Sequence, residues 1–224
     1  MKNLLTFLII IVATTATTTV FGQVVAKQNP ANFVPKGYVI FEKINGDLNK
    51  DGVDDYVLII KGTNKSKIIT DQSRGKLDRN RRGIIVLFSK KNAYELVAKN
   101  YNCFSSENED GGVYFAPEMS VKVKNGNLSI LYGHGRYGFW EYTFRYQNAG
   151  FELIGYDATR GGAVVSSQVS INFSTKRKQE KVNTNENAEG GDEVFKETWG
   201  NITVNKLLKL QEIKDFDEVD MTTY

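Results

Sequence analysis

The chain has 224 residues with 29 basic and 26 acidic side chains, so its formal net charge is only +3. Charges that nearly cancel give no electrostatic signature for nucleic acid or for an acidic lipid surface. The single cysteine, Cys103, excludes an internal disulfide and leaves a small buried side chain or an intermolecular bond. The fold must therefore be held by its core and by any metal that it binds.

Residues 1–22 have the parts of a secretory signal peptide. Lys2 supplies a positive start, residues 4–13 are apolar, and small residues precede an expected cut before Gln23. The apolar stretch is shorter than the roughly 20 residues that span a bilayer, and no cysteine near the cut offers a site for lipid attachment. We predict an exported protein, periplasmic or secreted, that is not a lipoprotein and leaves the membrane after cleavage.

The remaining residues, 23–224, have the length of one domain and read as β-structure almost throughout. Asn125-Gly126 predicts a hairpin, because both central residues of a type I′ turn need a positive φ. We therefore expect an all-β fold of mainly antiparallel hairpins, built as a single-domain sandwich or an open barrel-like sheet. Strands are predicted at residues 37–44, 56–60, 84–88, 94–98, 121–124, 128–132, 142–147, 151–156, 168–174 and 195–202.

Two polar segments, residues 62–82 and 175–192, interrupt this pattern and are predicted to be long exposed loops, since they can bury little apolar surface. Residues 204–213 could form one short C-terminal helix, and a closing strand fits them equally well. No aromatic side chains for base stacking lie between the basic residues of the first loop, which argues against nucleic-acid binding. Those basic residues are Arg74, Lys76, Arg79, Arg81 and Arg82.

The most informative stretch, residues 47–55, places oxygen-bearing side chains at positions 1, 3, 5 and 9, with Gly52 at position 6. A chain with this spacing can curl around one hard cation, and calcium takes 6–8 oxygen ligands. An EF-hand would need a glutamate at position 12, where Leu58 stands, so a helix–loop–helix site is excluded. The expected calcium ligands are Asp47, Asn49, Asp51, the backbone carbonyl of Val53, and Asp55.

These residues, followed by the apolar run at 56–60, resemble the calcium loops of FG-GAP and VCBS repeats, as in the integrin α-chain propeller. The resemblance covers about residues 44–60 in a single copy, so it implies a calcium loop between two strands and not a propeller. We expect the calcium ion to be structural, because carboxylates packed into one turn repel each other unless an ion binds. The wider layout is similar to exported proteins of Bacteroidota that have no known activity. Asp, Asn and Gly also form turns without any metal, which remains the alternative for this loop.

A glycine- and aromatic-rich turn at residues 132–141 is the candidate ligand surface, through His134, Arg136, Tyr137 and Trp140. The alternative is that its rings pack the core. A further set of acidic side chains could serve as catalytic carboxylates, although an exposed acidic turn is the simpler interpretation. This set comprises Glu107, Glu109, Asp110 and Glu141.

These patterns together favour an exported, non-enzymatic β-domain with a structural calcium site that binds a glycan or a protein partner. One alternative is a periplasmic inhibitor or immunity-type protein that acts through the exposed loop at residues 62–82. Another is a polysaccharide hydrolase that uses a pair of carboxylates. A Ser-His-Asp hydrolase is not indicated, because the sequence has no Gly-x-Ser-x-Gly turn.

Overall fold

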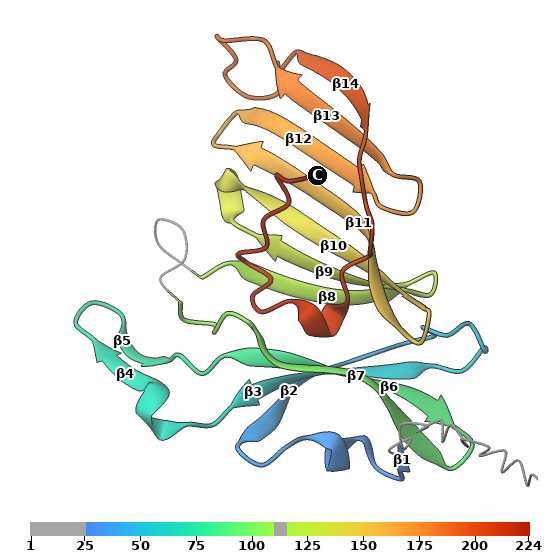
Figure 1. The fold of residues 1–224 in the computed structure, drawn as a ribbon. Helices are drawn as coiled ribbons and strands as arrows, with labels where there is room; N and C mark the ends of the chain where they lie inside the picture. Colours follow the sequence, from blue (N-terminus) through green and yellow to red (C-terminus); the bar gives the residue numbers. More distant parts are fainter. Residues whose placement is uncertain (1–25, 110–115) are drawn as a thin grey trace, which may run out of the picture.

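The computed structural model describes residues 26–109 and 116–224, which form two stacked antiparallel β-sheets (Figure 1). The predicted all-β sandwich is thereby confirmed, and neither sheet of the described chain closes into a barrel. The predicted signal peptide at residues 1–22 lies outside the described residues. None of the helices within the described ranges is long and apolar enough to cross a bilayer.

The five-stranded sheet has the order β1 (Ala26–Lys27), β7 (Ala93–Phe104), β6 (Arg82–Lys90), β3 (Asp55–Gly62) and β2 (Tyr38–Gly46). The seven-stranded sheet has the order β14 (Phe195–Asn201), β13 (Arg177–Asn183), β12 (Val165–Asn172), β11 (Gly150–Gly161), β10 (Gly138–Gln147), β9 (Asn127–Gly133) and β8 (Glu118–Lys124). A separate hairpin is formed by β4 (Ile68–Asp71) and β5 (Gly75–Asp78). Short 3-10 turns occur at η1 (Pro30–Phe33), η2 (Lys65–Lys67), η3 (Gly135–Tyr137) and η4 (Leu210–Glu212).

Side chains alternate between the two faces of each strand, and those that face inward form the core between the two sheets. Val57 and Ile59 of β3 point into this core, while Leu58 and Ile60 form a second cluster on the other face of the five-stranded sheet. Burial of both faces explains why residues 56–60 are a continuous apolar run. Each strand predicted from the sequence overlaps an observed strand, and the Asn125-Gly126 turn has the expected positive φ angles of 54° and 72°.

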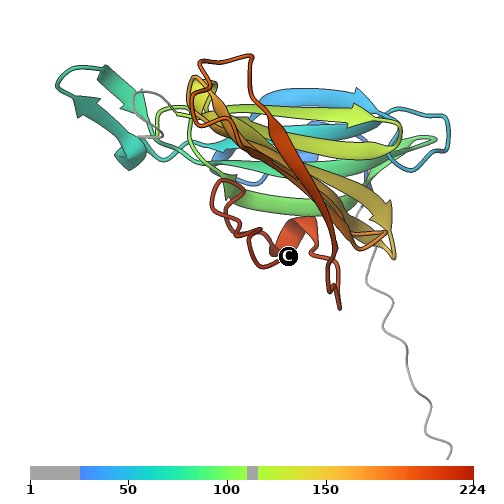
Figure 2. The same cartoon turned by 90° about the horizontal axis from the view of Figure 1, so that it is seen from above.

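The C-terminal residues 202–224 run back along one face of the seven-stranded sheet (Figure 2). Phe216 anchors them in the core, with its ring centroid 5.1 Å from that of Phe104 and 5.4 Å from that of Tyr142. Residues 204–213, for which a short helix and a closing strand fitted equally well, contain the single 3-10 turn Leu210–Glu212 and an isolated bridge between Lys209 and Glu152. Leu210 is fully buried in the core, and Leu207 and Leu208 are partly buried against it.

The prediction of a long loop at residues 175–192 is also wrong in part, because β13 occupies residues 177–183. This strand is polar on both faces, and it lies beyond the part of the sheet that covers the core (Figure 1). Its backbone groups pair with β12 on one side and β14 on the other. Backbone pairing thus supports a strand whose side chains bury little apolar surface.

Candidate functional site

The predicted metal loop joins β2 to β3 and turns its polar side chains inward. Asp47 Oδ2 accepts a hydrogen bond from the backbone N–H of Gly52 at 2.9 Å. The side-chain oxygens of Asn49 and Asp51 accept from the N–H groups of Asp51 and Val53, each at 2.9 Å. These bonds fix the turn with the first three predicted side-chain ligands directed toward its own backbone.

The fourth predicted side-chain ligand, Asp55, is fully buried and joins three parts of the fold. Its two oxygens accept the N–H groups of Leu48 and Ser89, each at 2.9 Å, and Ser89 belongs to β6. Burial raises the pKa of Asp55, these N–H donors partly offset that effect, and the negative charge of Asp51 raises it further. The charge of Asp51 thus disfavours the ionised form of Asp55.

The loop also contacts both sheets. Leu48 is 2% exposed and belongs to the core between the sheets. The Lys50 stem packs on the β8–β9 turn so closely that a Cβ atom on Gly126 would lie 2.5 Å from its Cε atom. Loop 47–55 therefore connects the strand pair β2–β3 to the edge of the seven-stranded sheet.

The donors in this loop suit calcium in kind, since they are all hard oxygens. Among the residues that the structure describes, however, no three His, Cys, Asp or Glu side chains are gathered closely enough to hold a metal ion. Calcium would thus have to draw Asp47 and Asp51 toward the buried Asp55. The loop has the ligand chemistry for a cation, with an arrangement that its own hydrogen bonds already stabilise.

The second predicted site, the aromatic turn, is largely used for packing. His134 stacks on Trp140 with ring centroids 3.9 Å apart, and its Nε2 atom lies 3.1 Å from Asp217 Oδ1 in the C-terminal segment. The His134 side chain is 13% exposed, and both its Nδ1 atom and the Trp140 Nε1 atom are buried. Burial raises the pKa of Asp217 in spite of the opposing effect of His134. The exposed members of the set are Arg136 and Tyr137.

The members of the predicted acidic set that the structure describes are held by separate local contacts. Lys61 Nζ lies 3.0 Å from Glu107 Oε2 and 3.2 Å from Asp78 Oδ2. Partial burial alone would raise the pKa of Asp78, but hydrogen bonds from Asn80 and Lys61 outweigh it and hold that pKa below its usual value. A general acid requires a protonated carboxyl group instead.

The other members of the acidic set serve different local contacts. Glu109 Oε1 accepts the backbone N–H of Ser106 at 3.2 Å, and Glu141 accepts the hydroxyl of Ser129. Asp110 lies outside the described residues. Cys103 is buried, and burial raises the pKa of its thiol, which agrees with the interpretation of a small core side chain.

The sequence did not point to the outer face of the seven-stranded sheet, which is the face turned away from the core and the C-terminal segment. Strand register places ten side chains there in two neighbouring rows. One row consists of Trp199, Gln179, Ser170, Asp157 and Glu141, in order from β14 to β10. The other consists of Glu197, Lys181, Gln168, Thr159 and Phe139.

This outer face is polar, with an aromatic ring toward each end. Trp199 is 58% exposed, and the Arg177 guanidinium lies 5.4 Å from its ring centroid. Between the rings is a depression of about 280 Å³, lined by Phe139, by the two glutamines, Gln168 and Gln179, and by neighbouring side chains of the rows. Hydroxyl, amide and carboxyl groups thus lie beside planar rings on a rigid sheet.

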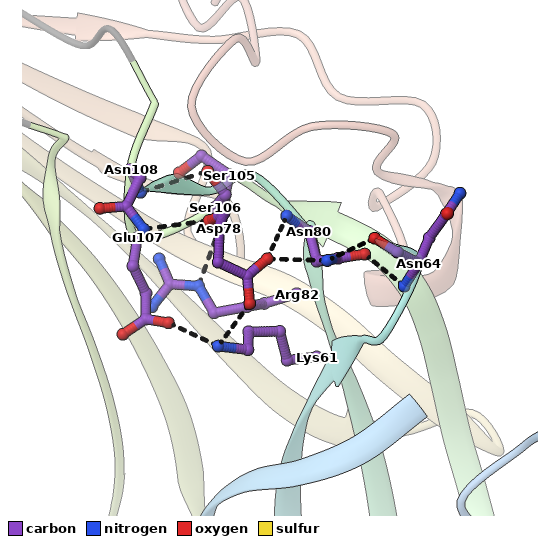
Figure 3. A network of polar contacts seen from close by, with 9 residues as sticks. All are labelled: Lys61, Asn64, Asp78, Asn80, Arg82, Ser105, Ser106, Glu107 and Asn108. Atoms are coloured by element: carbon purple, nitrogen blue, oxygen red, sulfur yellow. Dashed lines mark hydrogen bonds and ion pairs between the residues drawn. The ribbon is translucent and has the colours of Figure 1, made fainter. Parts of the chain in front are cut away.

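The segment at residues 62–82, predicted to be an exposed loop, contains an ordered hairpin that projects from the sandwich (Figures 1 and 2). We call residues 62–82 the basic arm. Its base is fixed by a polar network (Figure 3), in which Asn80 Oδ1 accepts the N–H of Asn64 at 2.9 Å and Asn80 Nδ2 donates to Asp78 at 2.7 Å. Asn108 Nδ2 also donates to the Asp78 carbonyl at 3.0 Å. The arm is therefore held in one orientation at its base.

Comparison with known proteins gives no further guide, because no family model, curated protein or solved structure matches this chain. The resemblance of residues 44–60 to FG-GAP and VCBS loops stays a prediction.

Proposed function

We propose that the protein is an exported, non-enzymatic binding module whose outer sheet face binds a glycan chain. The observation that carries this proposal is the pair of side-chain rows with Trp199 toward one end and Phe139 toward the other. Neighbouring strands lie about 4.8 Å apart, so five strands give a track of roughly 19 Å. That length suits a short oligosaccharide lying across the strands.

The chemistry of the rows favours a sugar over an apolar partner. A sugar ring offers C–H groups that pack on aromatic faces and hydroxyls that bond to amides and carboxylates. Trp199 and Phe139 supply the rings, and Gln168 and Gln179 supply both donors and acceptors. The rows carry three carboxylates, on Glu141, Asp157 and Glu197, and one ammonium, on Lys181, so the track favours a neutral glycan over an anionic one.

A glycan array comparing the wild type with Trp199→Ala tests this proposal. We expect the variant to lose most of the signal of the best-bound glycans, a fall of about tenfold or more from the loss of one stacking ring. Tyr137→Ala is the matched control, because Tyr137 is an exposed aromatic of the turn at 132–141 and should leave binding unchanged. Loss of binding in Tyr137→Ala but not in Trp199→Ala would move the site to that turn and overturn the proposal.

Calcium enters this proposal as a structural ion at loop 47–55, held by Asp47, Asn49, Asp51, the Val53 carbonyl and Asp55. The bound ion would neutralise the carboxylates that now repel one another and fix how β2 and β3 enter their sheet. The loop is not placed on the outer face of the seven-stranded sheet. Calcium should therefore change stability and leave the glycan surface itself intact.

A further inference from the structure

The base of the basic arm borders a large open pocket. The pocket has a volume of about 830 Å³, within the range typical of small-molecule sites. It lies between the arm and the end of the five-stranded sheet, near the network of Figure 3. The side chains that define its chemistry are Asn64, Asn80, Asn102, Lys67, Arg79 and Arg81.

Hydrogen-bond donors outnumber free acceptors in this pocket. The side-chain oxygen of Asn64 accepts from Ser66, and that of Asn102 accepts from the Tyr38 hydroxyl at 2.9 Å. Within the described residues, the amide nitrogens of Asn64 and Asn102 donate no hydrogen bond, and the Lys67 ammonium has no partner. The protein thus uses the acceptors itself and leaves donors directed at whatever fills the pocket.

The side chains around the pocket also carry a net positive charge, which favours an anionic ligand. Eight side chains between residues 61 and 82 are basic and two are acidic. Arg81 is balanced by Asp215, 2.5 Å away, and Glu109 adds one negative charge to the lining. An anionic ligand would therefore depend on Lys67 more than on Arg81, which is already paired.

We infer that this pocket binds a sugar that carries a carboxylate or a phosphate group. The acidic group would accept from Lys67, and the sugar oxygens would accept from the Asn64 and Asn102 amides. The exposed side chain of Ile69, which also lines the pocket, offers a small apolar contact for a sugar ring. This site is separate from the outer sheet face and does not depend on the glycan track proposed there.

Titration calorimetry with three probes tests the inference: trigalacturonate, the uncharged galactose trimer and glucose 6-phosphate. We expect at least one acidic probe to bind about tenfold or more tightly than the neutral trimer. Lys67→Gln should weaken the acidic probe about tenfold, since it removes a charged donor. Asn102→Asp, which keeps an acceptor for Tyr38 but replaces the donor with a negative charge, should weaken it further.

Lys65→Gln is the matched control, because Lys65 belongs to the same exposed turn η2 but does not line the pocket. It should leave affinity unchanged. Equal weakening by Lys65→Gln and Lys67→Gln would indicate diffuse attraction to the arm and overturn the inference. If neither acidic probe bound more tightly than the neutral trimer, or if no probe bound, the inference would also be overturned. Trp199→Ala should bind the acidic probe as the wild type does, which separates this test from that of the outer face.

Discussion

Loop 47–55 and the basic arm at 62–82 are both rich in Asp, Asn and Gly, yet the fold uses them in opposite ways. The loop places Leu48 in the core and directs its polar oxygens at its own backbone. The arm leaves Ile69 37% exposed and presents donors to an open pocket. Polar composition alone therefore does not separate a segment that stabilises the fold from one that can bind a ligand.

The largest expected effect concerns the core anchor of the loop. Leu48→Ala should lower the free energy of unfolding by about 2–5 kcal/mol, because it removes a buried side chain and leaves a cavity. Ile69→Ala, on the arm, should change it by no more than about 0.5 kcal/mol. Urea unfolding curves measure both values. Equal small losses in the two variants would mean that the loop is no more closely tied to the core than the arm.

A smaller effect concerns the Asp78 anchor of the arm. The pKa of Asp78 is held below its ordinary value of 3.8, so its contribution is complete above that value and is lost as pH falls through the lowered pKa. Asp78→Asn should loosen the arm at neutral pH by less than about 1 kcal/mol, since Asp78 and Lys61 are partly exposed.

Hydrogen exchange of the β4 and β5 amides, compared at each pH with the wild type, measures this loosening. Amides of β6 serve as an internal control and should not change. The difference between variant and wild type should vanish in acid. A difference that persists unchanged at low pH would show that the Asp78 charge does not anchor the arm.

The features that could be predicted from the sequence are those determined by residues close to one another in the chain. The Asn125-Gly126 turn and the alternating strands could be found because φ preferences and side-chain alternation are local. The outer face could not, because its rows exist only once the register of five strands is known. The environment of His134 includes Asp217, which lies 83 residues further along the chain and could not be placed beside it from the sequence. The polar strand β13 depends on the partners that flank it.

We propose that calcium bound at loop 47–55 would stabilise the fold, and thermal melting tests this proposal most directly. In metal-stripped protein, calcium at about 100 times its dissociation constant should add about 2.7 kcal/mol of stability and raise the Tm by roughly 5–10 °C. Asp51→Asn, which weakens one ligand and keeps the side-chain shape, should show a much smaller rise at the same calcium concentration. An unchanged Tm in the wild type with and without calcium would contradict the proposal.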